Sequence, residues 1–190
     1  MKRLSALMLT ANFISTLFYV ASYPYIYAEM MKVIPQLYIS IEQLLACIGT
    51  IMFCWIWNRY SDRLFRYYHL ILWAEMTADV ILFADVLIRG NLSFYFLLNV
   101  IIYAIITRNL CCGGTKMRAL VNPTEQLREQ YDNNSSIVNS VATILGAGFA
   151  ALFPQTLTML FVLALIGNVS DNFFYLYIYH KLTGGKHCVE

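Results

Sequence analysis

Ionisable side chains lie inside stretches of this sequence that are otherwise apolar: Glu75, Asp79, Arg108 and Asp171. Glu75 precedes Asp79 by four residues, so the two carboxyl groups share one face of a helix. At a rise of about 1.5 Å per residue, Asp79 lies about 18 Å from the start of its segment and Arg108 about 15 Å from the end of its segment. In a chain that crosses back and forth, these two ends lie on the same side, so the two depths match. Because an unpaired charge is costly inside a membrane, we expect Arg108 to pair with one of these carboxylates, or the carboxyl groups to carry protons or ions.

Two amides accompany Asp171 in its segment, Asn168 and Asn172. Polar groups of this kind also form interhelical hydrogen bonds that only hold helices together. This structural role is the alternative for every ionisable residue named above, and for Asn12 in the first apolar segment.

Asn12, Tyr19 and Tyr23 are spaced seven and four residues apart, which places them on one helix face. Tyrosines in this position can line a substrate path, because they stack on a ring and donate hydroxyl hydrogen bonds. An aromatic belt at the membrane surface is the alternative, and it is favoured for Tyr25 and Tyr27.

These side chains need membrane-crossing elements to position them. Hydrophobic residues make up 59% of the 190 residues and charged residues 13%, which is outside the usual composition of soluble domains. Helices are expected because a backbone in lipid must satisfy its own hydrogen bonds. With about 20 residues per crossing, the breaks at Pro, Gly and charge clusters predict one all-α integral membrane domain over 1–190 with six transmembrane helices, at 5–28, 38–58, 67–88, 93–118, 134–153 and 156–180. The first segment shows no cleavage pattern and is expected to remain as a helix.

Basic residues are distributed unevenly between the two sides of this six-pass path. Only Lys32 and Arg89 fall in the connections on one side, whereas nine flank the other: Lys2, Arg3, Arg59, Arg63, Arg66, Arg118, Arg128, Lys181 and Lys186. Basic flanks remain cytoplasmic. We therefore expect the protein to lie in the cell membrane with both termini on the cytoplasmic side.

The depths of polar residues suggest that the first three and last three segments are inverted repeats. Asn12 then corresponds to Asn99, and Asp79 corresponds to Asp171. Transporter sites tend to lie at such matching midplane positions.

The stretch from Asn58 to Arg66 resembles the loop between the second and third helices of major facilitator superfamily transporters. Asp62, Arg63 and Arg66 match its acidic and basic positions, while its glycines are replaced by Asn58 and Phe65. Arg108 followed by Gly113, and the stretch 123–128, also resemble patterns of that family. Together the matches suit the whole chain as one six-helix half of such a transporter.

The resemblance implies a function and a gating role. Asp62, Arg63 and Arg66 would form a charged cytoplasmic contact that opens and closes as helices rock. Exposed ion pairs are worth only about 0–1 kcal/mol, and a positive-inside anchor is the alternative. The expected function is movement of a small solute by alternating access through a homodimer of halves, with Asn12, Tyr19, Tyr23, Glu75, Asp79, Arg108 and Asp171 on the substrate or proton path. The alternative is a substrate-binding or regulatory subunit that works with a second membrane protein.

Enzymatic activity is not expected. Cys111 and Cys112 suggest a membrane cysteine peptidase, but His69 and His180, the candidate bases, lack an evident orienting group. Neither a metal-binding pattern nor a phosphate-binding glycine loop is present in the sequence. The five cysteines form no disulfide framework. We expect no cofactor and no metal. The expected partner is the lipid bilayer, and no nucleic-acid partner is expected.

Overall fold

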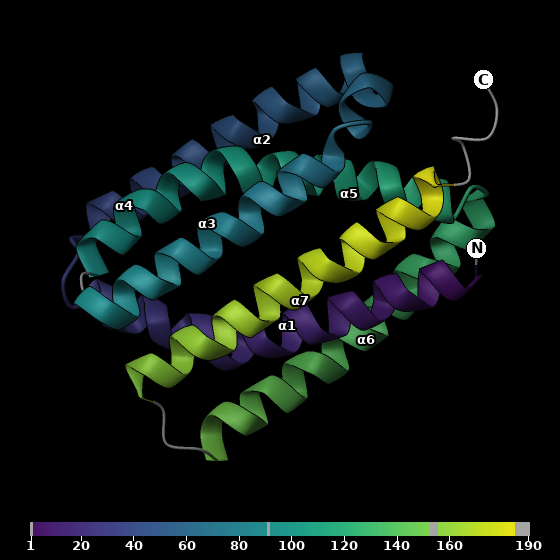
Figure 1. Ribbon diagram of the computed structural model, residues 1–190. Helices are drawn as coiled ribbons and strands as arrows, with labels where there is room; N and C mark the ends of the chain where they lie inside the picture. Colours follow the sequence, from purple (N-terminus) through teal and green to yellow (C-terminus); the bar gives the residue numbers. More distant parts are fainter. Residues whose placement is uncertain (1, 91, 153–155, 185–190) are drawn as a thin grey trace.

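The computed structural model describes residues 2–90, 92–152 and 156–184, and these form six long helices (Figure 1). They are α1 (Lys2–Met31), α2 (Gln36–Phe65), α3 (Tyr68–Arg89), a continuous helix of α4 (Leu92–Ile102), η1 (Tyr103–Thr107) and α5 (Arg108–Val121), then α6 (Glu125–Leu152) and α7 (Leu157–Thr183). The predicted all-α architecture is confirmed.

Within the described residues, five of the six helices are long and apolar enough to cross a membrane. The remaining helix, α3, carries Glu75, Asp79 and Asp85 along its length. The composition indicates an integral membrane protein in which the third helix is unusually rich in carboxyl groups.

Two helices extend well beyond their predicted limits. The predicted loop from Asn58 to Tyr68 is mostly helical, because α2 continues to Phe65 with a kink at Tyr60, where φ is −127° and ψ is 26°. Similarly, α6 begins at Glu125, where the Thr124 hydroxyl accepts a 3.3 Å hydrogen bond from the Leu127 N–H. The sequence segments end where hydropathy falls. The helices continue because Arg, Glu and Gln are good helix formers.

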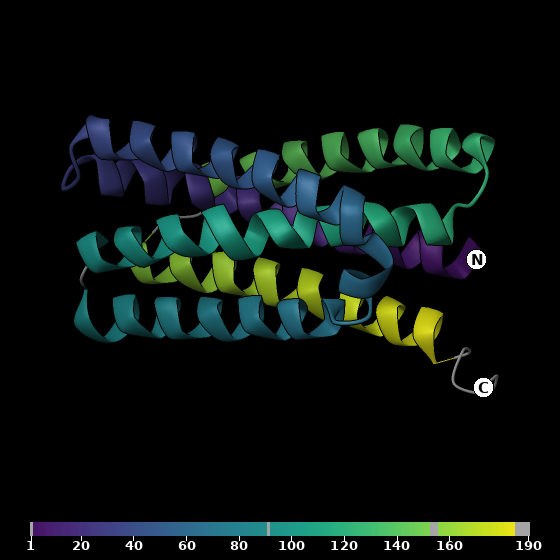
Figure 2. The same cartoon turned by 90° about the horizontal axis from the view of Figure 1, so that it is seen from above.

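The axes of all six helices lie roughly along one line, and successive helices run in opposite directions (Figure 2). The start of α1, the end of α7 and the α2–α3 and α5–α6 connections lie together at one end of the bundle, which we call the terminal end. The α1–α2 and α3–α4 connections lie at the opposite end. There Gly90 adopts a left-handed conformation with φ of 65° and caps α3. Only glycine takes this conformation readily.

Helix packing links the first three helices to the last three. We call α1 to α3 the first triplet, and the α4–η1–α5 helix with α6 and α7 the second triplet. Helix α1 packs on α6 and α7, the α4–η1–α5 helix packs on α2 and α3, and α3 packs on α7. If each helix of the first triplet is exchanged with the helix at the same place in the second triplet, the same set of packed helix pairs results.

The closest backbone approaches follow the same exchange. A Cβ at Gly146 of α6 would lie 2.6 Å from the carbonyl oxygen of Leu17 in α1. A Cβ at Gly49 of α2 would overlap the carbonyl oxygen of Ala104 in η1. Leu17 follows Asn12 by five residues, and Ala104 follows Asn99 by five residues. Equivalent helix pairs therefore approach closely, at corresponding positions of α1 and of the α4–η1–α5 helix, as an inverted repeat predicts.

The apolar core is divided into two clusters. One lies towards the terminal end and includes Met8, Tyr68, Met117 and Tyr179. The other lies towards the opposite end. It includes Ile26, Phe83, Tyr95 and Phe161. Polar side chains concentrate in the layer between the two clusters.

Candidate functional site

A cavity of about 470 Å³ runs through this polar layer and reaches Met8 and Tyr68 towards the terminal end and Tyr27 towards the other. Its lining comes from α1, α3, the α4–η1–α5 helix and α7, with Tyr131 added from α6. The polar part of the lining consists mainly of three carboxyl groups, four asparagines and seven tyrosines: Glu75, Asp79 and Asp171; Asn12, Asn99, Asn168 and Asn172; and Tyr19, Tyr23, Tyr27, Tyr68, Tyr103, Tyr131 and Tyr175. Of the seven residues predicted on the substrate or proton path, all except Arg108 line this cavity.

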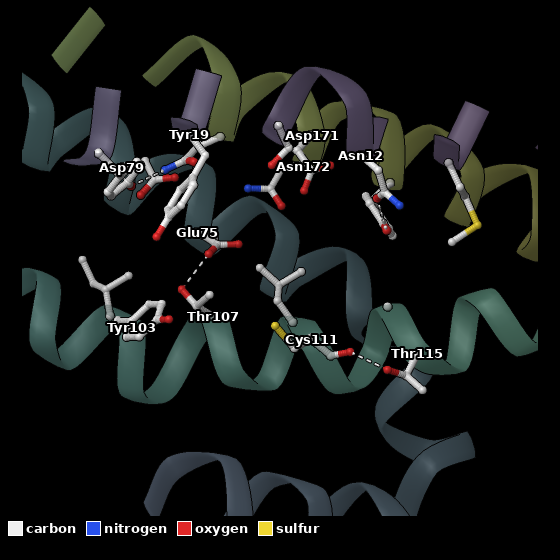
Figure 3. Close-up of a pocket in the computed structure, with 18 of the residues that line it drawn as sticks. Asn12, Tyr19, Glu75, Asp79, Tyr103, Thr107, Cys111, Thr115, Asp171 and Asn172 are labelled. Atoms are coloured by element: carbon white, nitrogen blue, oxygen red, sulfur yellow. Dashed lines mark hydrogen bonds between the residues drawn. The ribbon is translucent and has the colours of Figure 1, made fainter. Parts of the chain in front are cut away.

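Glu75 projects from α3 towards the π-helical segment η1 (Figure 3). The Thr107 hydroxyl donates a 2.8 Å hydrogen bond to its Oε1 atom. The amide of Asn172, on α7, lies beside the same carboxyl group. Glu75 is thus held from two other helices.

Asp79 is less well satisfied. Its side chain is 7% exposed, and its Oδ2 atom has no hydrogen-bond partner among the described residues. Asn168 lies beside its carboxyl group and donates a 3.2 Å hydrogen bond to the Tyr23 hydroxyl. Asp171 likewise has a buried Oδ1 atom for which the described part of the chain supplies no partner.

Two asparagines connect the triplets at equivalent places. The Asn12 amide donates to the Tyr131 hydroxyl and the Ser135 hydroxyl on α6, at 3.0 and 3.1 Å. The Asn99 amide donates to Glu42 on α2, at 3.2 Å. In each case the first helix of one triplet bonds to the second helix of the other. Asn12 therefore has the structural role named as its alternative, and it also lines the cavity.

The expected pairing of Arg108 with Glu75 or Asp79 is absent among the described residues. The Arg108 guanidinium instead lies over the Tyr103 ring, 4.2 Å from the ring centre. The reason is η1, whose π-helical turn inserts one residue relative to an α-helix and so rotates the following side chains. Arg108 lies at the expected level, but Thr107 is the residue turned towards Glu75.

Tyr19 and Tyr23 form a stacked pair on α1, with ring centres 4.7 Å apart and planes at 25°. Tyr19 is 54% exposed, and the cavity residues Cys111 and Thr115 of α5 are exposed as well. The cavity is therefore accessible from the surface between α1 and α5.

The predicted cytoplasmic contact has a different basic partner from the one expected. Lys116 of α5 donates to Asp62 at 2.9 Å and to Ser61 at 3.2 Å. Arg63 and Arg66 are exposed, and the Arg66 backbone carbonyl accepts a 2.6 Å hydrogen bond from the Tyr179 hydroxyl. The contact at the terminal end thus joins α2 to α5.

Three contributors were not singled out from the sequence: Thr107, Lys116 and Glu42. Glu42 is 1% exposed within an apolar helix, and its position among apolar residues was the available signal. Thr107 and Lys116 had no such signal, because a threonine and a lysine near a helix end are common.

Among the described residues, no hydrogen bond joins a histidine to a cysteine. The His69 ring contacts the Tyr179 hydroxyl at 3.3 Å, whereas Cys112 contacts the Cys54 thiol at 3.8 Å. In the described ranges no cluster of His, Cys, Asp or Glu could hold a metal ion.

Comparisons with protein-family models, with curated proteins and with solved structures find no match.

Proposed function

We propose that this chain is half of a solute transporter and that two copies form the complete pathway. The proposal rests mainly on the polar cavity inside an apolar bundle, which is open at the surface between α1 and α5. Polar groups facing hydrocarbon are costly. A second protein surface covering the opening removes that cost.

A second copy of this chain is the partner that we propose for that surface. Six crossings place both termini of a copy on the same, cytoplasmic side, and the same bias of basic residues orients both copies alike. A two-fold axis along the membrane normal then brings the two openings face to face. The resemblance of the 58–66 stretch to major facilitator transporters supports this proposal, since those proteins contain two six-helix halves related by such an axis. The exchange of contacts between triplets supports inverted repeats within each half.

Transport would proceed by rocking of the two bundles around the shared cavity. The Asp62–Lys116 contact lies at the terminal end, where it can break as the cavity opens to the cytoplasm. Asp62 is 93% exposed in this pair, so its rupture requires little energy. Asn12, Tyr19, Tyr23, Asp79 and Asp171 would contact the solute, and the carboxyl groups can also carry protons.

Cysteine cross-linking in membranes tests the dimer. In a background with the native cysteines replaced by serine, Tyr19→Cys should cross-link to its counterpart. Ile51→Cys, on the exposed side of α2, is the matched control and should not. The purified dimer should also release or accumulate solute in proteoliposomes. A chain that binds solute but remains monomeric and moves nothing would be a binding or regulatory subunit instead.

A further inference from the structure

The charges around the cavity are unbalanced. Three carboxyl groups line it, from Glu75, Asp79 and Asp171, against one guanidinium, from Arg118. Arg118 lies towards the terminal end and already donates to Asp132 at 3.1 Å. Arg108 is outside the lining and lies over Tyr103. The described lining therefore offers no uncommitted positive group to an anion.

Two of these carboxyl groups also have acceptor atoms to spare. Asp79 Oδ2 and Asp171 Oδ1 are buried without a hydrogen-bond donor among the described residues. A carboxylate in this condition is unstable at membrane depth unless it takes up a proton or a cation. Glu75 differs, because Thr107 already donates to it. Among the carboxyl groups of the cavity, the two aspartates thus supply the acceptor oxygens that a positively charged ligand would use.

The remaining walls suit an organic cation better than a metal ion. Tyrosine rings attract cations through their faces and shield the apolar parts of a ligand. Tyr19, Tyr23, Tyr68 and Tyr175 supply such rings. A metal ion needs clustered ligands, and no three His, Cys, Asp or Glu side chains of the described residues are grouped so as to hold one. The volume, about 470 Å³, falls within the range of small-molecule sites.

We propose that the solute of this cavity is a small organic cation, such as an alkyl or aryl ammonium compound, with Asp79 and Asp171 as its charge partners and tyrosine rings as its walls. This inference rests on the proposed transport function for its biological meaning. Its binding chemistry can be tested without transport.

The experiment measures binding of phenyltrimethylammonium to the purified full chain in nanodiscs, with benzenesulfonate as an anion of similar size. The cation should bind saturably and the anion should not. Asp79→Asn and Asp171→Asn should each weaken binding roughly tenfold or more, because a buried charge pair loses one partner. Asp85→Asn is the matched control, as it neutralises a carboxyl group of the same helix, α3, outside the cavity lining and should bind as the parent does.

Absence of saturable cation binding, equal binding of benzenesulfonate, or unchanged affinity in both aspartate variants would overturn the proposal. A second readout avoids reliance on variant folding. Cys111 lines the cavity and is exposed, so in a chain with the other cysteines replaced, phenyltrimethylammonium should slow its alkylation by a maleimide. An unchanged alkylation rate would count against the site. Cation binding without flux in proteoliposomes would refute transport alone, whereas flux of an anion without cation binding would refute the cation site alone.

Discussion

Thr107 donates its hydroxyl hydrogen bond to Glu75, one residue before the arginine whose charge would have matched that carboxylate. The π-helical segment η1 causes this offset, and π-helical turns are concentrated at functional sites. The consequence is a carboxyl group held in place with its charge not neutralised by an arginine.

A double-mutant cycle tests the contact. We expect Thr107→Val and Glu75→Leu to show a coupling of about 0.5–2 kcal/mol in the free energy of unfolding, as for interhelical hydrogen bonds in membranes. Arg108→Met with Glu75→Leu should be close to additive, since the two side chains do not meet. Reversible unfolding in mixed micelles gives both values. Strong coupling of Arg108 with Glu75 would show that they pair in the membrane.

Glycine substitutions test the equivalent close approaches. Gly49→Ala and Gly146→Ala should each destabilise the bundle by about 1–3 kcal/mol, because the new methyl group meets a backbone carbonyl that cannot move aside. Gly148→Ala is the control: its Cβ would meet nothing within 4 Å, so it should be neutral or up to about 1 kcal/mol more stable. Equal free energies of unfolding for all three variants would show that the close approaches at Gly49 and Gly146 do not exist.

Oxidation should join α2 to α5 through Cys54 and Cys112, whose sulfur atoms are 3.8 Å apart. With a protease site placed in the α3–α4 connection, the two fragments should remain linked on a non-reducing gel after treatment with copper phenanthroline. Cys112→Ser should abolish the link, and Cys111→Ser should retain it. A link that depends on Cys111 would place a different face of α5 against α2.

The Asp62–Lys116 contact should affect function more than stability. If the chain transports, Asp62→Asn should lower flux severalfold with near-normal abundance, because exposed ion pairs contribute little to stability. Reversing the pair, with Asp62→Lys and Lys116→Asp together, should recover part of the flux. Loss of the protein from the membrane in the Asn variant would assign Asp62 a structural role.

The sequence predicts the number and type of helices well, because hydropathy and length report them directly. It also places Glu75, Asp79 and Asp171 at levels that bring them to one cavity, since position along a helix follows from counting residues. It does not predict the partner of Arg108. The expectation for Arg108 rests on depth alone, and depth does not fix the direction in which a side chain points. The π-helical turn of η1 further changes that direction for the residues that follow it. Glu42 differs, because its position among apolar residues is a local signal. Its pairing with Asn99 of another triplet could not be predicted, because local patterns do not report contacts across the bundle.

The exchange of partners between the triplets has a consequence for biosynthesis. In the described residues, every extensive helix contact joins one triplet to the other. As the chain is made, α1 therefore enters the bilayer long before α6 and α7, its packing partners. During that interval Asn12 lacks Tyr131 and Ser135. Before α7 is made, α2 and α3 can pack on the α4–η1–α5 helix and α1 can pack on α6. The extensive contacts that join these two groups belong to α7, so a ribosome paused before Leu157 would hold two partial assemblies that are not yet one bundle.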